Sequence, residues 1–354
     1  MSNTFSPSLH IYPFELKLAQ PFRIAHETRH TQPSLIVGLY QEGQEGLGEA
    51  TATRYYGLDL SQMEQIVNQQ RTLIEEPWSQ PEQLWERLAS VMQGHSFELC
   101  AIDVAAHDLF ARHQGVPLWK MWELDKQQLP LSSYTISMGS LEEMTQQIKN
   151  HPWPVYKLKL GGQDDLALVR ALRQITDATF RLDANESWSF VQAQRWLPAM
   201  VDLGVELVEQ PLPRDHIDEY RVLKTLSPIP IVADESCQTE DDVVHCAALF
   251  HGINIKLMKC GGLTPARRMI AHARRLGLHV MVGCMTESSI GISAAAQLAP
   301  LLDYADLDGA LLLAEDLAEG VHIEAGHIYL NTRPGTGTRW VVPRPRQANT
   351  SPMQ

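Results

Sequence analysis

Three acidic residues, Asp183, Glu209 and Asp234, each close a short run of apolar residues. They follow one another at steps of 26 and 25 residues (209 − 183 and 234 − 209), which is the length of one strand, one helix and two loops. Residues at the carboxyl ends of neighbouring parallel strands converge, so we expect the three carboxylates to face one point. Such a cluster repels itself unless a hard divalent cation holds it, and carboxylate oxygens at a half-open site suit Mg²⁺. A single acid of this kind would more often cap a helix, but three in register favour a magnesium site.

Two lysines lie on the predicted strand before these acids. Lys157 and Lys159 are two residues apart, which places both ammonium groups on one face of the strand. Two like charges depress each other's pKa, so we expect Lys159 to act as a base and Lys157 to stay charged beside a substrate carboxylate. The alternative is a surface strand whose lysines deter aggregation, but the neighbouring Val155 and Leu160 favour an interior strand.

A third lysine is predicted to lie on the opposite side of the same site. Lys256 lies two predicted strands beyond Glu209 and is therefore across a closed barrel from Lys159. Lys259 competes with it, but Lys259 follows the apolar part of the strand and lies nearer to Gly261. The sequence thus predicts two bases on opposite faces of one substrate.

The strands and helices that must position these residues alternate at a regular spacing. After residue 128, short apolar runs alternate with helical patterns, and the steps from Lys159 to Asp306 are 24, 26, 25, 22, 28 and 22 residues. The simplest closure is a (β/α) barrel. The eight predicted strands are 134–136, 155–160, 180–183, 205–209, 229–234, 253–257, 278–284 and 304–308. The clearest helical patterns between them are 165–175, 189–203 and 264–276.

Residues 1–127 form a different, α+β unit. Residues 9–18 and 34–40 are predicted strands, and Gly46 to Ala50 is predicted to be a tight turn into a further strand. A helix is predicted over 97–113, because its apolar residues recur at offsets of 3, 7, 10 and 11.

The composition predicts a soluble, globular protein of the cytoplasm that acts on a small molecule. The 354 residues include 42 acidic and 29 basic side chains, so the net charge is 29 − 42 = −13, and 44% of the residues are apolar. This acidic balance argues against nucleic acid and membrane surfaces as partners, and no apolar stretch is long enough to span a bilayer. The five cysteines include no C-x-x-C pair, so we expect reduced thiols. The length excludes a small disulfide-stapled scaffold.

Together these motifs resemble the enolase superfamily, and within it the muconate-lactonizing subgroup. The stretches that carry the resemblance are 101–109 (AIDVAAHDL), 157–159 (KLK), 183–185 (DAN), 209–211 (EQP), 234–236 (DES), and Lys256 followed by Gly261 and Gly262. The resemblance implies a (β/α)₇β modified TIM barrel over residues 128–318, with an N-terminal α+β capping domain over residues 1–127. A C-terminal segment, residues 319–354, would return to the capping domain and end in a frayed tail from residue 344. One Mg²⁺ per subunit, held by the three acids, and a homo-oligomer are also implied.

The reaction that the resemblance implies begins with removal of a proton from the carbon next to a carboxylate. The metal stabilises the enediolate that results. With Lys159 on one face and Lys256 on the other, one lysine removes the proton and the other returns it, which inverts the stereocentre. Lys157 would attract the carboxylate. The expected class is a racemase or epimerase.

The last predicted strand ends in Asp306-Leu307-Asp308, which is similar to the D-x-D motif of the dipeptide epimerases. In those enzymes the paired acids hold the α-ammonium group of an L,L-dipeptide. The resemblance therefore implies an isomerase that epimerises the C-terminal residue of a dipeptide, similar to the L-Ala-D/L-Glu epimerases. Three alternatives stay open: a lyase of the o-succinylbenzoate synthase type, an N-acylamino acid racemase, and a noncatalytic barrel that binds a small metabolite.

Five further residues are candidates for contact with the substrate. In this family a loop after the first strand of the capping domain closes over the far end of the substrate, which points to Arg23 or Arg29 and to Glu27 in this chain, with the register of the loop left open. Thr135 and Cys284, at the ends of the first and seventh barrel strands, are candidates for the wall of the site. The preferred dipeptide side chains stay open.

Overall fold

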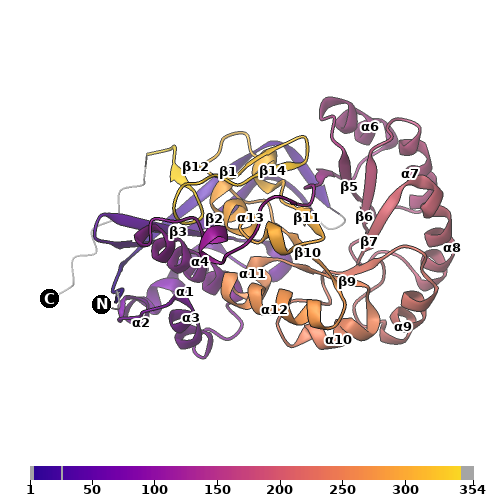
Figure 1. Ribbon diagram of the computed structural model, residues 1–354. Coiled ribbons are helices and arrows are strands. Elements are labelled where there is room, and N and C mark those ends of the chain that lie inside the picture. Colours follow the sequence, from indigo (N-terminus) through magenta and orange to yellow (C-terminus); the bar gives the residue numbers. More distant parts are fainter. Residues whose placement is uncertain (1–3, 25–26, 344–354) are drawn as a thin grey trace.

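The structure is a computed structural model of the 354-residue chain, and it describes residues 4–24 and 27–343. The side chains of Ile24 and Glu27 lie outside the description, and so does the tail predicted from residue 344. Figure 1 shows an N-terminal part made of a sheet and helices, a barrel beside it, and a C-terminal segment that lies against the N-terminal part.

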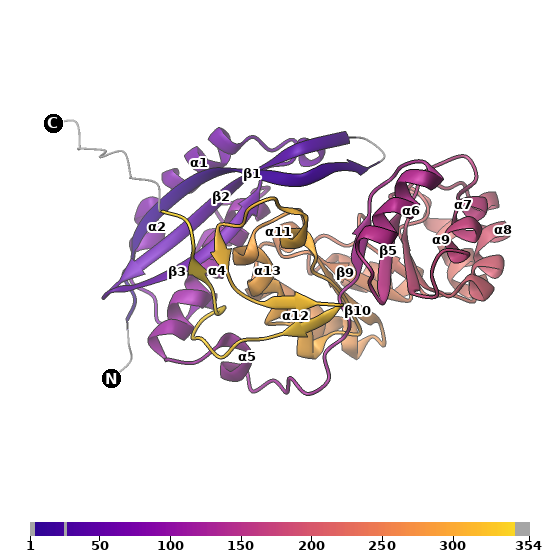
Figure 2. The same ribbon diagram turned by 90° about the horizontal axis from the view of Figure 1, so that it is seen from above.

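The N-terminal part is a three-stranded antiparallel sheet with helices packed against it (Figure 2). Its strands are β1 (Ser8–Ile24), β2 (Glu27–Gln41) and β3 (Gln44–Thr51), in the order β1-β2-β3. The helices that follow are η1 (Arg54–Tyr56), α1 (Leu60–Gln69), α2 (Arg71–Glu75), α3 (Pro81–Ala89), α4 (Ser96–His113) and α5 (Leu118–Met121). The predicted α+β unit is confirmed, and its long predicted helix is α4, which is buried along almost its whole length.

The tight turn predicted at Gly46 to Ala50 is wrong, because these residues lie inside β3. The turn before β3 consists of Glu42 and Gly43, whose φ angles of 50° and 82° lie in the left-handed region that favours glycine. The glycines of β3 allow close packing instead. A Cβ atom on Gly48 would lie 2.0 Å from the carbonyl oxygen of Ala101 in α4, so the strand and the helix meet backbone to backbone.

Eight parallel strands form the barrel, and one or two helices follow each of the first seven. The strands are β4 (Tyr134–Ile136), β5 (Val155–Lys159), β6 (Thr179–Asp183), β7 (Val205–Glu209), β8 (Ile231–Ala233), β9 (Gly252–Ile255), β10 (His279–Gly283) and β11 (Tyr304–Asp306), hydrogen-bonded in this order. The helices are α6 (Leu141–Asn150), α7 (Asp165–Arg173), α8 (Phe190–Met200), η2 (Val201–Leu203), α9 (Ile217–Leu226), α10 (Asp242–Leu249), α11 (Leu257–Cys260), α12 (Leu263–Arg275), α13 (Ser289–Ala296) and η3 (Ala299–Leu301). A parallel bridge between Ser132 and Ala305 joins the two ends of the sheet, so the predicted (β/α)₇β barrel is confirmed.

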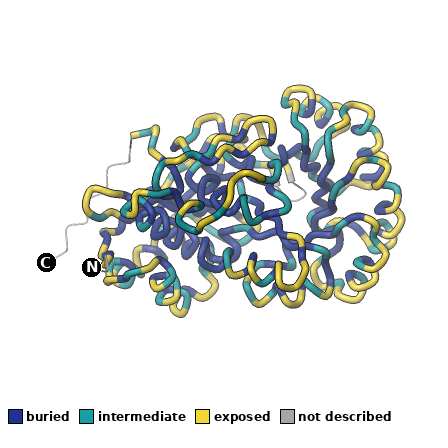
Figure 3. The backbone as a smooth tube through the Cα atoms, viewed as in Figure 1, coloured by how far each residue is buried: buried dark blue, intermediate teal, exposed yellow. Residues whose placement is uncertain are grey.

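The core runs through the barrel strands and α4, where Figure 3 shows continuous dark blue backbone. Parallel strands covered on both faces need unbroken apolar runs, and all four residues of β9 and all three of β8 are buried. The outer helices expose one face, as in α12, whose buried residues recur about every 3.6 positions. Among the described residues, no helix combines the length and apolar character that a membrane crossing requires.

The C-terminal segment returns to the N-terminal part of the chain. It contains η4 (Gly309–Leu312), β12 (Ala318–Glu319), β13 (His322–Glu324), β14 (His327–Tyr329) and β15 (Arg339–Trp340). Asp108 of α4 joins the two parts, because its carboxylate accepts hydrogen bonds from the N–H groups of Leu47 (2.8 Å) and Thr336 (2.7 Å). It also accepts a bond from Nε of Arg112 (2.9 Å). Domain limits at residues 127 and 318 stay predictions.

Removal of the Asp108 carboxylate should weaken this joint. Asp108→Ala leaves the buried N–H groups of Leu47 and Thr336 without their acceptor, and each unsatisfied buried donor costs roughly 1–3 kcal/mol. We expect the free energy of unfolding to fall by about 3 kcal/mol, measured by urea denaturation. The control is Asp202→Ala, at an exposed residue of η2, which should leave stability almost unchanged. Equal effects of the two substitutions would contradict the role of Asp108.

Candidate active site

A pocket of about 110 Å³ lies at the carboxyl ends of the barrel strands. Its walls come from the barrel and from the N-terminal part, which contributes Phe22, Arg29, Thr53, Tyr55 and Tyr56. The charged barrel residues in its walls include Lys157, Lys159, Asp234, Lys256, Asp306 and Asp308. The pocket therefore lies where chemistry is found in barrels of this type.

Three carboxylates meet beside this pocket. Asp183 is the last residue of β6, Glu209 is the last residue of β7, and Asp234 follows β8 directly. All three are buried, and one ligand atom of each lies within 4.8 Å of the others. Burial and the neighbouring Asp183 carboxylate raise the pKa of Glu209 to about 8. The structure brings the three predicted acids together, and their role as metal ligands stays a prediction.

Lys157 lies among the acids and forms ion pairs with three of them. Its Nζ atom is 3.0 Å from Oδ2 of Asp183 and 2.7 Å from Oε2 of Glu209. It is also 2.9 Å from Oδ2 of Asp306. Burial alone would lower the pKa of Lys157, but these carboxylates outweigh it and hold the pKa well above its ordinary value. The expectation that Lys159 depresses this pKa is therefore wrong, because it ignored the acids that the barrel brings against Lys157.

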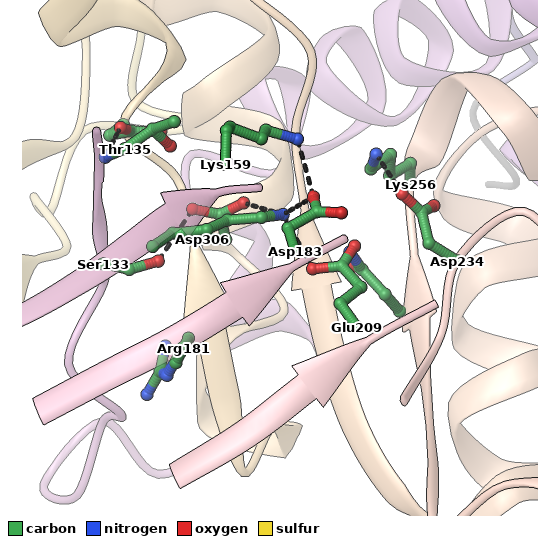
Figure 4. A network of polar contacts seen from close by, with 12 residues as sticks. Ser133, Thr135, Lys159, Arg181, Asp183, Glu209, Asp234, Lys256 and Asp306 are labelled. Atoms are coloured by element: carbon green, nitrogen blue, oxygen red, sulfur yellow. Dashed lines mark hydrogen bonds and ion pairs between the residues drawn. The ribbon is translucent and has the colours of Figure 1, made fainter. Parts of the chain in front are cut away.

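Lys159 and Lys256 approach the cluster from opposite sides of the barrel. Nζ of Lys159 is 2.6 Å from Oδ2 of Asp183, and Nζ of Lys256 is 2.6 Å from Oδ2 of Asp234. Three strands, β6 to β8, separate β5 from β9, which places the two lysines half-way round the eight-stranded barrel from each other. Both lysines line the pocket, and Figure 4 shows Asp183 beside Lys159 and Asp234 beside Lys256.

Lys259, the competing candidate, holds Asp234 from outside the pocket. Its ammonium group contacts Oδ1 of Asp234 and donates to the carbonyl oxygens of Asp234 (2.6 Å) and Cys237 (3.0 Å). Burial would raise the pKa of Asp234, but Lys256 and Lys259 hold it well below its usual range. Lys259 thus fixes the carboxylate, while Lys256 faces the pocket.

Asp306 and Asp308 form a second acidic wall. Oδ1 of Asp306 accepts a hydrogen bond from Oγ of Ser133 (2.7 Å), and Oδ2 of Asp308 accepts one from the N–H group of Thr135 (2.6 Å). Burial and the neighbouring Asp306 raise the pKa of Asp308 to about 7. A cationic group between the two acids favours their ionised forms, so this wall is suited to an ammonium group. Thr135 itself also lines the pocket, as a wall residue would.

The hairpin of β1 and β2 presents Arg29, not Arg23, to this pocket. Phe22 pairs with Arg29 across the hairpin, so their side chains lie on one face, and both line the pocket. Arg23, the next residue along β1, points away and lies 3.1 Å from Glu143 of α6. The sequence left the register of this loop open between Arg23 and Arg29, and the strand pairing places Arg29 in the pocket. The side chain of Glu27 lies outside the described residues.

Cys284 follows β10 directly and lines the pocket together with Met285 and Thr286. Glu49 of β3 anchors this loop, because its carboxylate accepts bonds from the N–H group (3.0 Å) and the Oγ atom (2.5 Å) of Ser288. A buried acid of the N-terminal part therefore positions one wall of the barrel pocket.

Asn185 and Glu235 are polar residues of the pocket to which the sequence analysis assigned no role. Nδ2 of Asn185 donates to Oε1 of Glu235 (3.2 Å), and both side chains line the pocket. They belong to the D-A-N and D-E-S motifs, of which only Asp183 and Asp234 were assigned a role. The two motifs therefore contained the information needed to predict Asn185 and Glu235. Arg29 was a candidate without a motif, and the register of the hairpin selects it over Arg23.

Both parts of the chain match known families. Residues 8–122 match the family described as "Mandelate racemase / muconate lactonizing enzyme, N-terminal domain", and residues 140–342 match "Enolase C-terminal domain-like". The second match alone covers more than half of the chain. The chain therefore belongs to the mandelate racemase / muconate lactonizing enzyme family of the enolase superfamily, as a dipeptide epimerase-like isomerase. The resemblance found in the sequence is confirmed.

Individual relatives agree with this assignment. An L-Ala-D/L-amino acid epimerase of Flavobacterium johnsoniae is 44% identical over 325 residues, which cover 92% of this chain and 97% of the relative. An L-Ala-D/L-amino acid epimerase of a Maribacter species is 45% identical over 332 residues, covering 93% and 98%. The solved dipeptide epimerase of Methylococcus capsulatus, complexed with Mg and L-Arg-D-Lys, matches with a TM-score of 0.89 and 32% identity, covering 95% of this chain and 100% of that one.

The stability of the acid cluster should depend on Lys157. Lys157→Met keeps an unbranched side chain that is one atom shorter and removes the ammonium group between the buried acids. Because removing one partner of a buried ion pair costs roughly 3–5 kcal/mol, we expect the free energy of unfolding in EDTA to fall by about 3 kcal/mol or more. Urea denaturation would measure it. Lys120→Met, at an exposed lysine of α5, is the control and should be neutral. A Lys157→Met protein as stable as the wild type would show that the cluster does not need this charge.

Proposed function

We propose that the chain is a magnesium-dependent dipeptide epimerase that inverts the α-carbon of the C-terminal residue of an L,L-dipeptide. Lys159 and Lys256 are assigned as its two bases. The observation that carries the proposal is that they line one pocket from opposite sides, with Asp183 beside one and Asp234 beside the other. Inversion by proton transfer requires one acid-base group on each face of the substrate, and this arrangement supplies both.

The three acids fit a magnesium ion. Asp183, Glu209 and Asp234 offer carboxylate oxygens, the ligands that Mg²⁺ prefers, from three different strand ends within 4.8 Å of one another. When bound, the ion supplies a Lewis acid that stabilises the negative charge developing on the substrate carboxylate. Lys157 adds a fixed positive charge beside the acids. The solved relative that binds Mg supports the choice of metal.

The acidic wall holds the other end of the substrate. A dipeptide carries an ammonium group at one end and a carboxylate at the other, and Asp306 and Asp308 complement the ammonium end. Ser133 and Thr135 fix the two carboxylates, which reduces the reorganisation needed on binding. The names of the relatives from Flavobacterium and Maribacter support L-Ala as the first residue of the dipeptide.

The two lysines exchange roles between the two directions of the reaction. A neutral Lys159 takes the α-proton onto Nζ, and the electron pair of the C–H bond moves into the substrate carboxylate. A protonated Lys256 then donates a proton from Nζ to the opposite face of the same carbon, which restores the C–H bond with inverted configuration. Oδ2 of Asp183, 2.6 Å from Nζ of Lys159, positions this amine at the edge of the acid cluster.

Isotope exchange tests the reaction and the metal together. In heavy water with Mg²⁺, the protein should incorporate deuterium at the C-terminal α-carbon of L-Ala-L-Leu and L-Ala-L-Glu, measured by mass spectrometry. EDTA should slow this exchange at least about 100-fold, because the charge on the carboxylate loses its Lewis acid. N-acetyl-L-Ala-L-Leu places a neutral amide against Asp306 and Asp308, so its kcat/KM should be at least about 100-fold lower.

Two results would contradict this proposal. Faster exchange of N-acetyl amino acids than of dipeptides would favour an N-acylamino acid racemase. Absence of exchange from both substrate classes, in protein that is folded and binds Mg²⁺, would favour a lyase of the o-succinylbenzoate synthase type.

Substitution of each lysine should remove exchange from one stereoisomer only. With L-Ala-L-Leu and L-Ala-D-Leu as separate substrates, Lys159→Ala should lose about 10³-fold in α-deuterium exchange from one isomer, and Lys256→Ala should lose it from the other. The physical reason is that each base reaches only one face of the α-carbon. Lys149→Ala, at an exposed lysine of α6, is the control. If either variant kept exchange from both isomers, the two-base mechanism would be wrong.

A further inference from the structure

A second cavity, of about 330 Å³, adjoins the catalytic pocket between the β1–β2 hairpin and α6. We call it the outer cavity. Three side chains line both spaces: Phe22 of β1, Thr135 of β4 and Leu312 of η4. We call these three the partition, because each has one side towards the catalytic pocket and one towards the outer cavity.

The partition lies next to the place where the dipeptide begins, an argument that rests on the proposed function. The ammonium nitrogen between Asp306 and Asp308 is bonded directly to the α-carbon of the first residue, at about 1.46 Å. Its side chain must therefore start within a few atoms of the acidic wall. Asp308 is hydrogen-bonded to the backbone of Thr135, which belongs to the partition. The first side chain thus starts beside the partition.

We propose that Leu312 and Phe22 limit the first residue of the substrate to a small side chain, and that the outer cavity lies directly behind this barrier. Leu312 is half-buried and ends η4, the short helix that starts immediately after Asp308. The N–H group of Leu311 donates to the carbonyl oxygen of Asp308 (2.8 Å), which ties this helix to the acidic wall. One segment therefore supplies both the ammonium anchor and the size limit.

Leu312 and Phe22 are the members of the partition whose size can change without loss of the anchor. Thr135 is buried, and its N–H group holds Asp308. Phe22 is half-buried near the end of β1, where it pairs with Arg29 in the hairpin. Neither the Leu312 nor the Phe22 side chain makes a polar contact to the acids, so shortening either one removes bulk and leaves the charges in place.

The outer cavity can receive an apolar side chain. Its aromatic wall is Tyr134, which stacks on His151 at 4.8 Å between ring centroids. Several of its polar wall residues already have partners. Gln147 accepts from the N–H group of Ser137 and donates to its carbonyl oxygen, and Arg23 pairs with Glu143 at 3.1 Å. Nε2 of Gln146 likewise donates to Oδ1 of its helix neighbour Asn150 (2.7 Å). These groups need no bond from a ligand, so a leucine side chain entering from the pocket leaves no polar group newly unpaired.

The test compares first residues of different size while the second residue stays the same. We would measure kcat/KM for α-deuterium exchange with L-Ala-L-Ala and with L-Leu-L-Ala. The wild type should prefer L-Ala-L-Ala by about 100-fold, since the partition opposes the leucine side chain. Leu312→Ala should reduce this preference to about 10-fold or less, mainly through a lower KM for L-Leu-L-Ala. Phe22→Ala should shift it in the same direction.

The neighbouring leucine provides the matched control. Leu311 is 39% exposed and borders the outer cavity but not the catalytic pocket, so Leu311→Ala should keep the wild-type preference. The proposal is overturned if the wild type accepts both dipeptides equally, or if folded Leu312→Ala or Phe22→Ala keeps the wild-type ratio. If Leu312→Ala does not fold, the ratio of kcat/KM values measured for Phe22→Ala tests the proposal alone. Wild-type protein that exchanges neither dipeptide would instead overturn the proposed function, and this inference with it.

Discussion

The structure depends on holding three carboxylates together away from bulk water. Buried negative charges repel one another and lose hydration, so the site requires compensating positive charge at close range. The barrel provides it: β5 brings Lys157 and Lys159 to the cluster, and the segment after β9 brings Lys256 and Lys259. Because parallel strands converge only at one end of the barrel, the charge cluster and the fold that assembles it are inseparable.

The N-terminal part turns this cluster into a closed reaction site. It covers the carboxyl ends of the strands with residues such as Phe22 and Tyr56, and it anchors a pocket wall through the bonds from Ser288 to Glu49. Asp108 fastens the C-terminal segment to the same unit. Reduced contact with water strengthens every electrostatic interaction in the pocket. The hydrogen bonds of Glu49 and Asp108 between parts of the chain therefore affect the strength of these interactions.

Local patterns predicted most of this arrangement. The eight barrel strands, the acid cluster and the opposed lysines follow from regular spacing, because a βα unit has a nearly constant length. The sequence did not provide the pairing register of the β1–β2 hairpin or the close approach of β3 to α4. The hairpin register decides that Arg29 and not Arg23 faces the pocket. The packing of α4 decides that Gly48 lies in a strand and not in a turn. The raised pKa of Lys157 likewise depends on Asp306, which is distant in the sequence.

In the proposed reaction, the two ends of the substrate are recognised by different kinds of element, and this separates chemistry from selectivity. The acids and bases lie on or directly after rigid barrel strands, where a small displacement would disrupt proton transfer. The ammonium anchor begins on β11, but the residues after Asp308 run into the short helix that carries Leu312. Side chains on that helix can change size without moving Lys159 or Lys256. A fold built in this way can adopt new dipeptides through its last βα segment while its catalytic centre stays the same.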